Sequence, residues 1–126
     1  MIDHVSVGVR SLAAAERFYE AALGALGYEK LVVRPATIGF GKRYAEFWIN
    51  LRPATTGDRD NGAHVCLRAR SRDEVDRFHA AALAHGGAED GAPGPRQHDD
   101  PGRTYYAAFI RDPDGNRIEA VCFLAR

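Results

Sequence analysis

The chain has 126 residues, of which 45% are hydrophobic and 27% charged, a size and composition typical of one folded domain and not of a disordered segment. Seventeen Lys and Arg residues balance seventeen Asp and Glu residues, so the formal net charge is zero. Because nucleic acids and anionic membranes usually select a basic excess, the sequence argues against both as partners.

No apolar run approaches the length of a membrane span, and the opening residues Met1–His4 lack the basic and apolar regions of a signal peptide. The two cysteines, Cys66 and Cys122, form no CxxC pair. We therefore expect a cytoplasmic protein with both thiols reduced and in the core.

The chain contains an internal repeat. A shift of 60 residues aligns His4–Gly27 with His64–Gly87 and gives ten identities in 24 positions without a gap. Unrelated segments of this length share roughly one or two identities. Two amphipathic helices can share alanines and leucines, but not a His-Val and an Arg-Ser pair at the same offset. The repeat therefore predicts a duplicated module.

The first module begins with alternating residues over Ile2–Val9, which predict a half-buried strand. Ser11 is a predicted helix N-cap, and Gly27 a predicted helix end. Three further strand-like segments follow: Lys30–Arg34, Thr37–Gly41 and Ala45–Leu51.

The second module repeats this order, with a strand over Ala63–Ala69 and a helix that begins at a capping box, Ser71–Glu74. The Gly- and Pro-rich Ala88–Arg103 is expected to be mostly loop, with one short strand at most. Two more predicted strands, Thr104–Ile110 and Arg117–Leu124, flank a turn at Asp112–Asn116. The sequence thus predicts one domain of the α+β class, with modules at 1–56 and 62–126 and a linker at 57–61.

Strand parity places polar side chains on the sheet faces that the helices do not cover. His4 alternates with the valines of the first strand, and the repeat places His64, Cys66 and Arg68 on the equivalent face. Glu119 shares its strand face with large apolar residues, where a carboxylate needs a partner. If the two sheets curl toward each other, His4, His64 and Glu119 converge.

Two imidazoles and one carboxylate form a recurring ligand set for Fe(II), Mn(II), Ni(II) or Zn(II), so we expect a divalent metal ion. Glu46 is a candidate fourth ligand, on the same strand face as Trp48 and Asn50. Glu46 either completes the ligand set or lies at the exposed start of its strand while Trp48 lines the pocket.

Three segments resemble the vicinal-oxygen-chelate superfamily, which comprises glyoxalases, bleomycin-resistance proteins and extradiol dioxygenases: Ile2–Val9, Ala15–Tyr19 and Asp112–Glu119. Two more, Phe47–Ile49 and Tyr105–Phe109, resemble a short, glyoxalase-like bacterial branch. The resemblance implies two tandem βαβββ modules that form a U-shaped, partly closed mixed sheet with the helices outside.

The resemblance also implies that His4, His64 and Glu119 are the metal ligands, and that the remaining glyoxalase position falls near Glu46 or Trp48. It further implies a homodimer in which His4 meets His64 and Glu119 of the partner chain. In this superfamily the metal binds oxygen atoms of a small-molecule substrate and stabilises the charge that develops on them.

Three functions remain open. A metal-dependent lyase, isomerase or transferase of the glyoxalase type would use Glu119 or Glu46 as its catalytic base. An Fe(II) extradiol dioxygenase would use the same three ligands, with His98 as a candidate extra base.

The third function is drug sequestration in a dimer groove without a catalytic metal. Four aromatic residues are candidates to line that groove or the substrate pocket: Tyr44, Trp48, Tyr105 and Tyr106. Three arginines are candidates to bind an anionic substrate group or to be ordinary surface charges: Arg43, Arg68 and Arg103.

Overall fold

The computed structural model describes residues 1–54, 61–97 and 103–125, and these residues form two βαβββ modules. The first module contains β1 (Val5–Val9), α1 (Leu12–Gly24), β2 (Glu29–Val33), β3 (Thr37–Gly41) and β4 (Phe47–Leu51). The second contains β5 (Val65–Arg68), α2 (Arg72–Ala84), β6 (Ala88–Arg96), β7 (Arg103–Arg111) and β8 (Arg117–Ala125). The predicted α+β class and paired modules are confirmed, and most of the predicted linker 57–61 lies outside the described residues.

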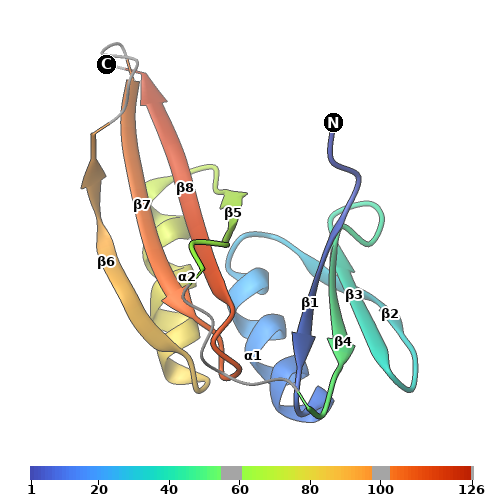
Figure 1. Ribbon diagram of the computed structural model, residues 1–126. Helices are drawn as coiled ribbons and strands as arrows, with labels where there is room; N and C mark the ends of the chain where they lie inside the picture. The colour runs from blue at the N-terminus through green and yellow to red at the C-terminus, as the bar shows by residue number, and fades with distance from the viewer. Residues whose placement is uncertain (55–60, 98–102, 126) are drawn as a thin grey trace.

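Each module forms its own four-stranded mixed sheet (Figure 1). The strand orders are β1-β4-β3-β2 and β5-β8-β7-β6, so the two sheets have the same topology. The first strand of each module pairs in parallel with the last, and the other neighbours are antiparallel. As a result β1 and β5 are both edge strands.

Both helices begin at the serines that the repeat predicts. The Ser11 hydroxyl accepts a hydrogen bond from the Ala14 amide at 3.3 Å, and the Ser71 hydroxyl accepts one from the Glu74 amide at 3.2 Å. The Glu74 carboxylate accepts from the backbone amide of Arg70, one residue before the cap, at 2.8 Å. These bonds fix where each helix leaves its preceding strand.

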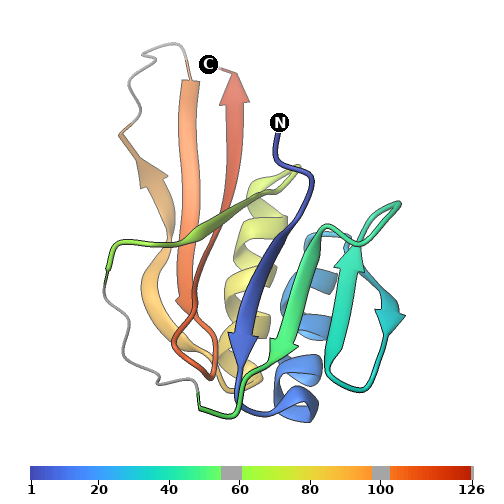
Figure 2. The same cartoon turned by 45° about the vertical axis from the view of Figure 1, so that its right-hand side comes forward.

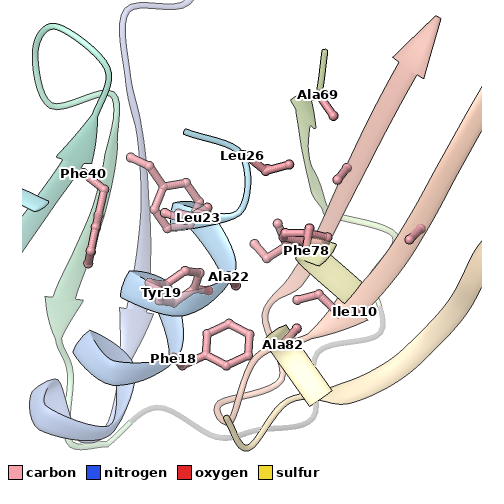
Figure 3. Packing of buried hydrophobic residues seen from close by; sticks show 14 of the residues in the cluster. Phe18, Tyr19, Ala22, Leu23, Leu26, Phe40, Ala69, Phe78, Ala82 and Ile110 are labelled. Carbon is pink, nitrogen blue, oxygen red and sulfur yellow. The ribbon is translucent and has the colours of Figure 1, made fainter. Parts of the chain in front are cut away.

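The helices of the two modules pack against each other and lie between the two sheets (Figure 3). Phe18 and Leu23 of α1 and Phe78 of α2 are fully buried and belong to one core cluster drawn from both modules. Each helix therefore covers one face of its own sheet. The opposite face, which we call the helix-free face, points away from the common core (Figure 2).

Residues 88–96 form strand β6, so the prediction of a mostly loop segment there was wrong. β6 lies at the edge of its sheet and pairs only with β7 among the described strands. Pro93 and Pro95 are compatible with this position. Proline has no backbone N–H to donate, and an edge strand has one side that pairs with no neighbouring strand. Two register shifts absorb the irregular backbone, between Glu89 and Gly91 and between Gly91 and Gly94.

The expectation that both thiols lie in the core was also only half correct. Cys122 is buried, but Cys66 is exposed. The reason is strand parity, since Cys66 alternates with the inward-facing Val65 and Leu67 and so shares the helix-free face with His64.

The predicted turn at Asp112–Asn116 also joins the two modules. The Asp112 carboxylate accepts hydrogen bonds from the amides of Asp114 and Asn116 and from the Tyr19 hydroxyl of α1, the last at 2.5 Å. Burial and the nearby Asp112 charge raise the pKa of Tyr19 well above its ordinary value, so the phenol remains a donor. Arg10 adds an ion pair to Asp114 at 2.9 Å.

We expect Tyr19→Phe to lower the free energy of unfolding by about 1–3 kcal/mol, because the buried Asp112 carboxylate loses a donor. Urea denaturation followed by circular dichroism measures the change. Tyr44→Phe is the matched control, since its exposed hydroxyl makes one long contact, 3.4 Å from the Asp3 carbonyl. Equal stability of the two variants would contradict a role for this bond in joining the modules.

Candidate functional site

The Glu119 carboxylate is buried on the helix-free face of the second sheet. Glu119 lies in β8 and is 2% exposed. Its Oε1 lies 3.2 Å from Nε2 of His64, and its Oε2 accepts a hydrogen bond from the Tyr105 hydroxyl. The structure therefore brings together two of the three predicted ligands and one predicted pocket residue.

Sheet register explains how Tyr105 reaches this carboxylate. Tyr105 pairs with Phe123, which lies four residues along β8 from Glu119. To reach Glu119, the Tyr105 side chain must lean along the sheet past the next pair of residues on the same face, Ala107 and Val121. The small side chain of Ala107 leaves room for the phenol ring of Tyr105. Burial and the bond to Glu119 raise the pKa of Tyr105, which keeps its hydroxyl protonated as a donor.

Cys66 pairs with Glu119 in the parallel β5–β8 ladder and lies against the same carboxylate. Burial of the sulfur raises the pKa of the Cys66 thiol to about 12, and the negative charge of Glu119 adds to the increase. The thiol is therefore protonated at neutral pH in this arrangement.

His4 and His64 of one chain line the same pocket. The pocket has a volume of about 300 Å³, and its lining includes His4, Glu46 and His64. Nδ1 of His4 lies 2.7 Å from a carboxylate oxygen of Asp3, which leaves Nε2 for another partner. Within residues 1–54, 61–97 and 103–125 of one chain, no three His, Cys, Asp or Glu side chains are close enough to hold one ion.

The repeat shows which residue of the first module is equivalent to Glu119. Ser6, the counterpart of Cys66, pairs with Trp48 in the β1–β4 ladder, just as Cys66 pairs with Glu119. Glu46 lies two residues earlier, before β4 begins. Trp48, not Glu46, thus occupies the position equivalent to Glu119, with its ring against Gly39 and the guanidinium of Arg34 at 5.6 Å.

The other predicted pocket residues lie elsewhere. Tyr106 faces α2, where its hydroxyl donates to Asp76 at 2.7 Å, on the opposite side of the sheet from Glu119. Tyr44 and Arg43 are exposed in the turn between β3 and β4. His98 and the side chain of Arg103 are outside the described part of the chain.

The His64–Glu119 pair fits a divalent ion. Two ligands about 2.1 Å from one ion and at a tetrahedral or right angle to each other are separated by about 3.0–3.4 Å. The observed separation of Nε2 and Oε1 is 3.2 Å. Tyr105 occupies the other carboxylate oxygen, an arrangement that orients a metal-ligating carboxylate in many proteins.

Comparison with known proteins agrees with this architecture. The family model of the glyoxalase/bleomycin resistance protein/dioxygenase superfamily matches residues 1–120. The chain belongs to this superfamily. A member from Albidiferax ferrireducens, described as a glyoxalase/bleomycin resistance protein, is 36% identical, with a TM-score of 0.82 over 95% of this chain and 97% of that one.

More distant superfamily structures share the fold. A lactoylglutathione lyase from Agrobacterium tumefaciens is 21% identical, with a TM-score of 0.65 over 97% of this chain and 92% of that one. A fosfomycin resistance protein from Listeria monocytogenes is 16% identical, with a TM-score of 0.67 and the same coverage, 97% and 92%. No functionally curated protein matches the chain. Neither helix in the described residues is long and apolar enough to cross a membrane.

The raised pKa of Cys66 makes a prediction for the metal-free protein. In a Cys122→Ser background, we expect iodoacetamide to modify Cys66 at about pH 8 at least about 100-fold more slowly than free cysteine, although the residue is exposed. Glu119→Gln should speed the reaction because it removes the adjacent negative charge. Peptide mass spectrometry measures the rates, and a rate equal to that of free cysteine would contradict the proposed contact.

Proposed function

We propose that the protein is a divalent-metal-dependent enzyme of the glyoxalase type, a lyase, isomerase or transferase that binds a small substrate through its oxygen atoms. One observation carries the proposal: the buried Glu119 carboxylate lies 3.2 Å from Nε2 of His64 on a sheet face that no helix covers. Burying a carboxylate on such a face costs free energy that an apolar residue would avoid. A metal ion offsets that cost.

Three side chains would hold the ion: His64, Glu119 and His4. Zinc, nickel, manganese and iron all suit this ligand set, and the bound ion would stabilise negative charge on substrate oxygens. The Tyr105 hydroxyl binds Oε2 of Glu119 and so leaves Oε1 for the ion. Asp3 binds Nδ1 of His4 and so leaves Nε2 as the nitrogen available to a metal ion.

We assign the third ligand to a second protomer. In a homodimer, His4 of one protomer would join His64 and Glu119 of the other. Two observations support this arrangement: the described part of a single chain assembles no three-ligand cluster, and both β1 and β5 are open edge strands. Glu46 lines the pocket with His4, and its Oε1 lies 3.5 Å from the backbone amide of Lys42; we assign it the role of accepting a substrate proton.

The metal assignment predicts about one divalent ion per chain in the wild-type protein and its loss in His64→Ala and Glu119→Ala. Equilibrium dialysis with zinc, nickel, manganese and iron, followed by elemental analysis, measures the stoichiometry. His79→Ala and His85→Ala are matched controls. His79 of α2 contacts Glu89, and His85, which caps the end of α2, contacts the Ala81 carbonyl. Absence of binding for all four ions, or retention in His64→Ala, would refute the assignment.

The shared site predicts complementation between two inactive variants. Mixing His4→Ala with His64→Ala subunits should restore one complete site per heterodimer, because one of its two sites then contains neither substitution. Metal stoichiometry after denaturation, mixing and refolding measures the recovery. A site contained within one chain would show no recovery above the separate variants.

One observation favours a second function, sequestration of a small molecule. Trp48 stands where the repeat places the counterpart of Glu119, and so adds an aromatic surface to the helix-free face of the first sheet. Trp48 is the only tryptophan of the chain, so its fluorescence reports binding directly. Tight, chelator-insensitive quenching by an aromatic, cationic or peptide-like drug would support sequestration, whereas chelator-sensitive binding would support the metalloenzyme.

A further inference from the structure

Arg68 is held beside the candidate metal ligands by a row of side chains. It lies in β5 on the same helix-free face as His64, and its guanidinium lies 4.7 Å from the centre of the Phe123 ring. The Phe123 ring in turn lies 5.3 Å from the ring of Tyr105, whose hydroxyl binds Glu119. A contact with the face of an aromatic ring uses none of the N–H donors of a guanidinium.

In the part of the chain that the structure describes, the Arg68 guanidinium lies against an aromatic ring and not against a carboxylate. Five other arginines make ion pairs with carboxylates within the described segments: Arg10, Arg70, Arg77, Arg111 and Arg117. Among the described residues, no carboxylate forms an ion pair with Arg68, and Arg68 is exposed. Glu119 lies one row away but is already bonded to His64 and Tyr105. The helix-free face thus presents a positive charge available to an incoming anion.

We propose that Arg68 binds an anionic group of the substrate, a carboxylate or a phosphonate, while the metal site binds its other oxygen atoms. This inference rests on the proposed function, because it places both groups of one molecule in the same site. Arg68 pairs with Val121, and Cys66 pairs with Glu119, so the two positions are one side-chain repeat apart. That repeat is about 7 Å, which suits a small substrate whose anionic group is separated from its metal-binding oxygens by a few bonds.

A guanidinium suits this role because its fork of donors matches two oxygens of a carboxylate or phosphonate. The face of the second sheet therefore has two complementary anchors. His64 and Glu119 select a cation, and Arg68 selects an anion. A neutral substrate would leave the Arg68 charge unused.

The test measures anion binding separately from metal binding. Acetate, methylphosphonate and neutral acetamide are titrated into chelator-treated protein, with the Arg Nε–H resonances followed by NMR. We expect acetate or methylphosphonate, but not acetamide, to shift the Arg68 Nε–H resonance and the backbone amide resonances of β5 and β8 saturably. The anion that binds more strongly identifies the anionic group, and the backbone amides report binding to the Arg68 variants. Arg68→Met should weaken this binding about tenfold or more, and Arg68→Lys should retain part of it.

Arg72→Met is the matched control, since Arg72 also lies over an aromatic ring, at 5.2 Å from that of Tyr106, but on the other side of the sheet. Anion binding that is unchanged in Arg68→Met, equal for acetamide, or equally weakened in Arg72→Met would overturn the inference. Metal stoichiometry is measured on the same variants and should be unchanged in Arg68→Met. Wild-type protein that binds the anion through Arg68 but binds no metal would refute the proposed function and not the anion site.

Discussion

Each module has one helix to cover a sheet that has two faces. The helices are used on the inner faces, where they also pack against each other and complete one core from both modules. The second face of each sheet is then left without a helix, and strand parity decides which side chains stand on it. Four residues share that face in the second module: His64, Cys66, Arg68 and Glu119. They alternate with Ile118 and Ala120 of the core and with Val65 and Leu67, which are partly buried against it.

The two modules have the same backbone arrangement but different side chains on their helix-free faces. The β1–β4 and β5–β8 ladders have the same parallel register, so Ser6 and Trp48 stand where Cys66 and Glu119 stand in the other module. The inner faces stayed apolar in both copies because both contribute to the shared core. The helix-free faces carry no such packing requirement within the chain, so a carboxylate in one copy and an indole in the other are both compatible with the fold.

Much of the fold could be predicted from the sequence because the first strand and the helix of each module are indicated twice, once in each copy of the repeat. Ser11 and Ser71 cap their helices, and the alternation of β1 and β5 places the histidines away from the core. Strand β6 could not be predicted in this way, since Pro and Gly are poor strand formers and only its pairing with β7 makes the segment extended.

Part of the candidate site also followed from parity, which brought His64 and Glu119 to one face. The hydrogen bond from Tyr105 to Glu119 could not be predicted from parity, because it depends on how the long Tyr105 side chain leans along the sheet past Ala107. The small residue two positions after Tyr105 is the signal that could have suggested it. The place of Trp48 likewise required the observed ladder register, since sequence alone left Glu46 and Trp48 as alternatives.

The choice of partners around Glu119 keeps two opposite charges separate on one surface. The Tyr105 hydroxyl, a neutral donor, binds one oxygen of Glu119, whereas a bond from a guanidinium would place a positive charge directly beside the carboxylate. Arg68 stands one side-chain repeat from the position paired with Glu119, and its guanidinium lies over the Phe123 ring. The aromatic contact stabilises the cation without consuming its hydrogen-bond donors. The Glu119 carboxylate and the Arg68 guanidinium therefore belong to positions about one side-chain repeat apart on one face, and the contacts of Tyr105 and Phe123 link them.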